Sequence, residues 1–340
     1  MKGRLRSTIQ IIIFLFIGGF LFWLAFRDQN LSEIKDSIAH SHYGWILPVL
    51  IFAFLSNLSR SVRWNMLIHP IGYKPKTFNT FSAVLIGYFA NLLVPRLGEI
   101  TRCTVLNRYE KIPMQSLLGT VLAERVIDVL TLLVILALVI MLQFELLSAF
   151  VIRNLFNPLA DKINSYFQHS TTAYIIAGAV FLVLIVVAWR VLLQFKSTKF
   201  YIKFLELLRG FFEGFNTVRR LRSKWLFLAH TFFIWVCYIM MSYLCFFCFD
   251  FTASFSFLKG VTAMVFGGIG FVVPVQGGIG AYHYIVRETM MVYGLSEEQG
   301  LSFATLCHGA QIGGIIVFGA LCFVLLPVFN RKKSEADATA

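Results

Sequence analysis

Long apolar segments separated by short polar stretches divide this chain. Six of them approach the length of about 20 residues with which a helix spans a bilayer. They cover residues 9–26, 45–58, 117–142, 173–193, 225–249 and 302–329. Residues 78–94 and 258–273 are also apolar, and each of these two segments ends in a stretch that contains proline and glycine. The pattern predicts an all-α polytopic membrane protein with six to eight transmembrane helices.

Composition supports this fold class. The chain has 340 residues, of which 58% are hydrophobic and only 14% are charged, whereas soluble domains carry about a quarter of charged residues. A net charge of +13 in a soluble protein suggests nucleic acid as a partner. Here the basic residues lie between apolar segments, where they set orientation and contact anionic headgroups. We therefore expect no nucleic acid. The six cysteines lack metal-site spacing, and we expect neither metal nor cofactor.

The distribution of basic residues predicts the topology. Five stretches of the chain are basic, and we therefore place them in the cytoplasm. They are the amino terminus and residues 60–76, 96–111, 196–224 and 331–333. Residues 144–172 are nearly charge-balanced and are placed outside. Both termini are then cytoplasmic. We expect one membrane domain over residues 1–333 and a short disordered cytoplasmic tail over residues 334–340. We also expect the second apolar segment to extend past Arg63, with its arginines snorkelling to the surface.

Two cytoplasmic loops in succession flank residues 78–94, which favours a re-entrant hairpin that enters from the cytoplasm. The same reasoning makes residues 258–293 a hairpin that enters from outside. Both contain the motif Val-Pro-x-x-Gly, at 94–98 and 273–277. Similar broken segments of opposite orientation are typical of inverted-repeat transporters. The alternative is that both segments cross fully, which gives eight plain helices.

Three ionisable residues interrupt the apolar segment 117–142. Glu124 and Asp128 are four residues apart and share one face of a helix, and Arg125 is placed to pair with Asp128. Each such charge costs about 2.5–3.5 kcal/mol near the centre of a membrane helix. Residues of this kind face a bundle interior or an aqueous cavity, and they mark substrate pathways more often than not. The alternative is an internal salt-bridge cluster that holds helices together.

The two Pro-Gly segments supply the other candidate residues. Pro95 and Gly98 in the first segment, and Pro274, Gly277, Gly278 and Gly280 in the second, are predicted hinges, because they break helices and permit turns. Arginine suits the bidentate binding of phosphate. The predicted substrate-binding residues here are Asn91, Arg96, Glu99 and Arg102 in the first segment and Gln276 and His283 in the second.

These residues resemble the transmembrane region of the lysylphosphatidylglycerol synthases, a broad flippase-like family. The likeness rests on Asn91 with the segment 95–102, on Glu124-Arg125-x-x-Asp128, and on Pro274-x-x-Gly-Gly-Ile-Gly. It implies a membrane domain that moves a lipid between leaflets, and it gives no support for aminoacyl transfer, because the soluble synthase domain is missing from this sequence. Many members carry an acidic residue where this chain has His283.

The sequence therefore favours a lipid transporter of a bacterial cytoplasmic membrane, flippase or scramblase-like, that moves a phospholipid, an aminoacylated lipid or a glycolipid. The expected partners are membrane lipids with anionic or zwitterionic headgroups; a lipid-synthesising enzyme and a second copy of the chain remain open. Two alternatives are a membrane-embedded lipid-modifying enzyme and a scaffold subunit of an envelope-lipid or glycosyltransferase complex. We expect no enzyme, because the sequence carries no nucleotide, hydrolase or metal motif.

Overall fold

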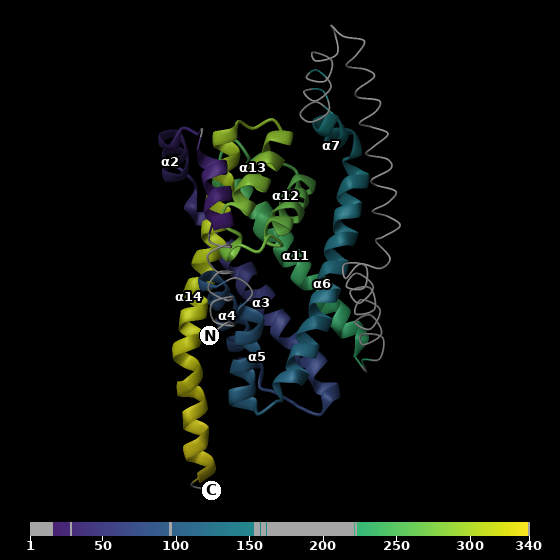
Figure 1. The fold of residues 1–340 in the computed structure, drawn as a ribbon, viewed down its shortest axis with the longest axis vertical. Coiled ribbons are helices and arrows are strands. Elements are labelled where there is room, and N and C mark those ends of the chain that lie inside the picture. Colours follow the sequence, from purple (N-terminus) through teal and green to yellow (C-terminus); the bar gives the residue numbers. More distant parts are fainter. Residues whose placement is uncertain are drawn as a thin grey trace, which may run out of the picture.

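The computed structural model describes residues 16–27, 29–94, 97–152, 157, 161, 221 and 223–338. Within these ranges the chain folds into helices and connecting turns, which confirms the predicted all-α membrane fold (Figure 1). The first described helix is Phe16–Phe26. The others are α2 (Leu31–Ala39), α3 (Ile46–Ile68), α4 (Thr77–Leu93), α5 (Leu97–Glu110), α6 (Met114–Leu142), α7 (Phe144–Val151), α11 (Lys224–Cys245), α12 (Phe257–Gly270), α13 (Ala281–Val292) and α14 (Glu297–Ala338).

Four helical stretches in the described part of the chain are long and apolar enough to cross a membrane. They are Tyr43–Ile71, which contains α3, Met114–Leu142, Lys224–Cys248 and Glu297–Arg331. The second apolar segment does extend past Arg63, as predicted. Its arginines do not snorkel, however, because Arg60 and Arg63 are buried within the bundle. The expected helix at 173–193 lies outside the described residues.

Two pairs of shorter helices pack against each other in the interior, α4 with α5 and α12 with α13. In Figure 1, α4 and α5 occupy the lower half of the molecule, and α12 and α13 occupy the upper half. These pairs coincide with the two Pro-Gly segments of the sequence. Their entry into the bilayer from opposite sides stays a prediction.

Both pairs require glycine at positions where their helices approach each other closely. In the first pair, a Cβ on Gly98 would overlap the carbonyl oxygen of Gly87, so the two helices approach closely. In the second, a Cβ on Gly270 would lie 2.8 Å from the Cα of Tyr282. The turn that follows α12 contains the 3₁₀ helix η5 (Gln276–Gly278). Pro95 and Arg96 fall outside the described residues.

The two pairs meet end to end near the middle of the molecule. A Cβ on Gly277 of η5 would lie 3.0 Å from Leu92 Cδ2, near the end of α4, and η5 packs against α4. The long helices α6 and α14 run beside both pairs along the long axis (Figure 1). This arrangement brings the two Pro-Gly elements together from opposite ends.

Helix α14 continues to Ala338. The predicted division into a membrane domain over residues 1–333 and a disordered cytoplasmic tail over residues 334–340 stays a prediction.

Candidate functional site

Two carboxylates and three arginines form a buried network between α3, α5 and α6, here called the charged cluster. Arg60 Nη1 lies 2.5 Å from Glu124 Oε1 and 3.0 Å from Asp128 Oδ2. Arg63 Nη2 lies 2.7 Å from Asp128 Oδ1 and 3.6 Å from Glu124 Oε1. Arg102 Nη1, on α5, lies 3.2 Å from Glu124 Oε2. The spacing of three residues on α3 and four on α6 aligns both sets face to face.

Burial makes these ion pairs interdependent. Glu124 and Arg63 are 0% exposed, and Arg102 is 3% exposed. Moving such charges out of water is offset only by good geometry and by further hydrogen bonds. Removal of one partner of a buried pair typically costs about 3–5 kcal/mol, because the other charge stays behind unpaired. The cluster therefore holds α3, α5 and α6 in one arrangement.

Helix α11 and an indole ring complete the surroundings of the arginines. Arg60 Nη2 donates to the hydroxyl oxygen of Tyr238 at 2.9 Å, and Arg63 Nη1 donates to Thr231 Oγ1 at 3.2 Å. The guanidinium of Arg102 lies over the ring of Trp64, 4.7 Å from its centroid, in a cation–π contact. Four helices thus contribute to the cluster.

Arg60 and Arg63 were predicted to lie at the cytoplasmic surface, in a basic stretch or as snorkelling side chains, and the structure buries them inside the bundle instead. Both lie on α3 and face the carboxylates of α6. Arg102 was counted as a loop charge as well, and it is buried in the same cluster. The missed signal was the pair of carboxylates on α6, which require buried cations at matching helical spacing. The predicted pairing of Arg125 with Asp128 is also wrong, because Arg125 Nη2 lies 3.4 Å from Glu99 Oε1.

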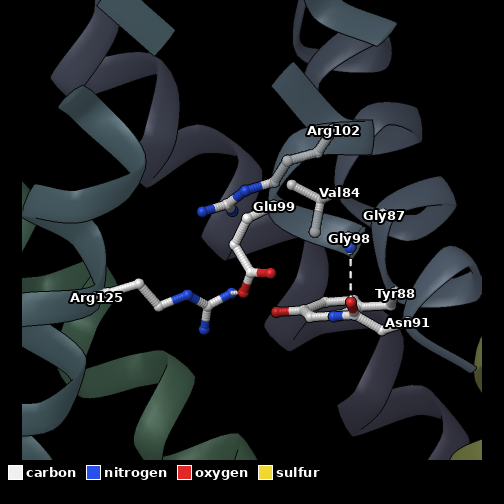
Figure 2. A pocket seen from close by; sticks show the side chains of 8 residues that line it. All are labelled: Val84, Gly87, Tyr88, Asn91, Gly98, Glu99, Arg102 and Arg125. Atoms are coloured by element: carbon white, nitrogen blue, oxygen red, sulfur yellow. Dashed lines mark hydrogen bonds and ion pairs between the residues drawn. The ribbon is translucent and has the colours of Figure 1, made fainter. Parts of the chain in front are cut away.

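Glu99 and Arg125 form a second, more accessible ion pair, here called the rim pair. Their side chains are 33% and 36% exposed, in contrast to the charged cluster. They line a small pocket between α4, α5 and α6 with Arg102 and Asn91 (Figure 2). Asn91 Oδ1 accepts a hydrogen bond from Gly98 N at 2.6 Å, which fixes the start of α5 against the end of α4.

The pocket is small and polar. Its cavity volume is about 10 Å³, roughly the space that one water needs and far below the roughly 300–1,000 Å³ of pockets for drug-sized ligands. Its wall includes Val84, Gly87 and Tyr88 of α4. A group larger than a water can therefore enter the pocket only if one of the lining side chains moves aside.

Arg102 is incompletely satisfied at this pocket. Its Nη1 contacts Glu124, but its Nε and Nη2 atoms are buried without a hydrogen-bond partner among the described residues. Buried donors normally have partners, so an orphaned pair on a charged side chain points to a missing acceptor.

The second helix pair has a different environment at its tip. His283 is buried, 5.8 Å and 5.7 Å between ring centroids from Phe22 and Phe26, and 4.9 Å from His308. His308 Nε2 lies 2.8 Å from the carbonyl oxygen of Gly277. The contacts described here are aromatic or to the backbone, and they include no carboxylate or arginine.

The structure therefore divides the predicted binding residues between two places. Those on α4, α5 and α6 come together around the pocket and the charged cluster: Asn91, Glu99, Arg102, Glu124, Arg125 and Asp128. Gln276 and His283 lie at the tip of the second pair. Arg96 lies outside the described residues.

The fold and these contacts define a polytopic helical membrane protein with a buried ionic site. Comparison with known proteins narrows the class. Residues 10–334 match the family model described as the lysylphosphatidylglycerol synthase TM region, and the chain belongs to this family. This confirms the resemblance found in the sequence.

Two archaeal proteins are similar over part of their length. A UPF0104 membrane protein of Methanocaldococcus jannaschii is 32% identical over 127 residues, which are 36% of this chain and 36% of that protein. A UPF0104 membrane protein of Methanothermobacter thermautotrophicus is 25% identical over 100 residues, 28% of this chain and 30% of that protein. The chain thus covers about a third of the length of these relatives.

Proposed function

We propose that this protein moves a lipid headgroup between the leaflets of a membrane, as a flippase or scramblase-like transporter. The observation that carries the proposal is the buried charged cluster with an adjoining polar pocket inside a helical membrane bundle. Ionisable residues at membrane depth mark substrate pathways by default. Membership of a flippase-like family supports the same function. The candidate cargo is a phospholipid, an aminoacylated lipid or a glycolipid.

The contact between the two helix pairs suggests a path. Broken helical elements that meet from opposite ends place a site at the middle of inverted-repeat transporters. Here the ends of α4 and η5 touch, at Leu92 and Gly277, and Asn91 of the pocket lies one residue from that contact. A headgroup would cross beside this junction while its tails stay in lipid.

We propose transport in preference to catalysis. A general base needs a free oxygen within reach of the substrate. The carboxylates of Glu124 and Asp128 are both held by arginines of α3, which leaves them poorly placed to take a proton from a lipid. Product formation from a lipid extract by the purified protein would contradict this choice.

Translocation in proteoliposomes tests the proposal. We would reconstitute the full chain and follow headgroup-labelled phospholipids, aminoacylated lipids and glycolipids. Arg125→Ala removes a rim residue, whereas Glu288→Gln alters an ion pair on α13 in which the carboxylate of Glu288 is 32% exposed, similar to Glu99, and its partner Arg287 is buried. We expect faster crossing for a subset of lipids, lost in Arg125→Ala and kept in Glu288→Gln. Crossing no faster than in empty liposomes would refute transport by this chain alone.

A scaffold subunit is the remaining alternative, and a charge swap separates it from a transporter. Because Arg125 pairs with Glu99, the appropriate swap is Glu99→Arg with Arg125→Glu. The exchanged pair can still form across the same gap, so a scaffold should keep its function. A transport site that recognises one orientation of charge should lose translocation.

We also propose a bacterial cytoplasmic membrane with both termini in the cytoplasm, and a re-entrant α4–α5 pair. Arg108 is exposed near the end of α5, so Arg108→Cys offers a labelling site. The six native cysteines are buried, which keeps the background low. Labelling only after the membrane is opened supports the re-entrant pair, and labelling in intact cells contradicts it.

A further inference from the structure

Charge does not balance around the pocket. Among the described residues, the charged cluster and the rim pair bring together four arginines and three carboxylates. The group therefore carries one positive charge in excess. An uncompensated charge at membrane depth is costly, so an anion is expected beside it.

The excess charge lies on the pocket side. Glu124 and Asp128 are engaged by Arg60 and Arg63, which are not among the residues that line the pocket. Only the Nη1 atom of Arg102 contacts Glu124, and its Nε and Nη2 atoms have no hydrogen-bond partner in the described part of the chain. Arg102 also lines the pocket, so its unused donors are available to a ligand there.

The donors define the chemistry of that ligand. Arginine presents N–H groups in a rigid fork that matches two oxygens of a phosphate or a carboxylate. Arg125 adds a second guanidinium to the same pocket, and its Nε is also buried without a partner among the described residues. A group with several acceptor oxygens and one negative charge satisfies both arginines, and a phosphodiester has this form.

Glu99 already places a carboxylate among these groups. In Figure 2 its carboxylate points toward Arg125, with the guanidinium of Arg102 to one side and Tyr88 and Asn91 to the other. The distance of 3.4 Å to Arg125 Nη2 is long for a charge-assisted hydrogen bond. Glu99 thus provides an anion that is close to the arginines but loosely held.

We infer that this pocket binds one phosphate group between Arg102 and Arg125, and that Glu99 is the exchangeable internal anion which the phosphate displaces. The inference rests on the proposed function and deepens it, because it names the part of the headgroup that is recognised. The exposed position of the rim pair makes the exchange feasible, since partly exposed ion pairs are weak. Once Glu99 turns outward, the phosphate supplies the negative charge that Arg102 lacks.

A binding measurement on the purified full chain tests this assignment. The probes are short-chain phosphatidylglycerol, diacylglycerol with the same chains, and inorganic phosphate, titrated calorimetrically in detergent. We expect phosphatidylglycerol to bind and diacylglycerol not to bind. In Glu99→Gln the competing anion is gone, and phosphatidylglycerol should bind about two- to five-fold more tightly, the range for losing a weak ion pair. A gain in affinity cannot arise from misfolding.

Two further variants sharpen the result. Arg102→Lys keeps the charge but loses the fork, and it should weaken binding about ten- to a hundred-fold. Glu288→Gln removes a similar carboxylate on α13 and should leave the affinity unchanged. Unaltered or weaker binding in Glu99→Gln, an equal gain in Glu288→Gln, or equal binding of diacylglycerol would each overturn the assignment.

Two further comparisons show whether the pocket takes free phosphate or only a lipid headgroup, and whether the transport proposal and the phosphate-site proposal stand independently. If inorganic phosphate competes with phosphatidylglycerol, the pocket accepts free phosphate as well as a headgroup. If it does not compete, the site is specific for the lipid, and either result supports a phosphate site. Tighter binding in Glu99→Gln without translocation in proteoliposomes refutes transport and leaves the phosphate site standing. Translocation without a Glu99 effect refutes only the phosphate site.

Discussion

The two helix pairs share an architecture but differ in chemistry. Both bring short helices into close contact through glycine, at Gly98 in α4–α5 and at Gly270 in α12–α13. The first pair is bordered by the charged cluster and the rim pair. At the tip of the second pair, His283 packs against aromatic rings and against His308 of α14.

This difference teaches that the likeness of the Val-Pro-x-x-Gly motifs concerns backbone shape. Each motif separates two short helices that pack against each other. The neighbouring side chains then decide what each pair can bind. We therefore propose headgroup recognition for α4–α5 and a structural role at the junction for α12–α13.

The strongest test removes a charge from the first pair's surroundings. Glu124→Gln leaves Arg60, Arg63 and Arg102 with only Asp128 as a counter-charge. We expect a loss of about 3–5 kcal/mol in unfolding free energy, visible as a large drop in thermal stability in detergent. The matched variant Glu288→Gln should cost under about 1 kcal/mol, because its carboxylate is partly exposed and Arg287 keeps Glu297 as a second counter-charge at 3.4 Å. Equal stability of the two variants would show that the cluster is not a buried network.

Alanine at the two tips compares them directly. Gly98→Ala would press on the side chain of Asn91, with atoms at 2.6 Å, and Gly280→Ala would place a Cβ in a residue with φ of +83°. We expect each to cost about 1–3 kcal/mol, through overpacking in the first case and backbone strain in the second. Only Gly98→Ala should also weaken phosphatidylglycerol binding. Gly309→Ala meets nothing within 4 Å and should be neutral by both measurements.

A smaller effect is expected at the histidines. His308→Phe removes the hydrogen bond to the carbonyl of Gly277, and it should cost about 1 kcal/mol in thermal unfolding. Phosphatidylglycerol affinity should not change, since the pocket belongs to the first pair. A loss of affinity would mean that the second tip takes part in recognition.

The smallest effect concerns the link between α6 and the second pair. The Tyr293 hydroxyl donates to Gln143 Oε1 at 2.8 Å, and Gln143 in turn donates to Thr262 Oγ1. Tyr293→Phe should cost about 0.6 kcal/mol, the average for interhelical hydrogen bonds in membranes. A double-mutant cycle with Gln143→Leu measures the coupling free energy between the two side chains, and a value near zero would show that this hydrogen bond does not stabilise the contact between α6 and the second pair.

The sequence predicted the fold class because a spanning helix must satisfy its own backbone and face lipid, and both requirements are local. It also singled out Glu124 and Asp128, since charges in an apolar helix stand out against their neighbours. The two Pro-Gly segments were found because proline and glycine likewise stand out in an apolar stretch. None of these features depends on a distant partner.

Pairing was decided only by the tertiary structure. Arg60 and Arg63 resemble the arginines of a membrane-flanking loop until α3 is placed against α6, and Arg125 has equally suitable neighbours in Asp128 and Glu99 until α5 is placed. Which pocket Arg102 lines likewise depends on the contact between α4 and α5. A charged side chain at membrane depth is fixed by its nearest counter-charge in space, and helix packing sets that distance.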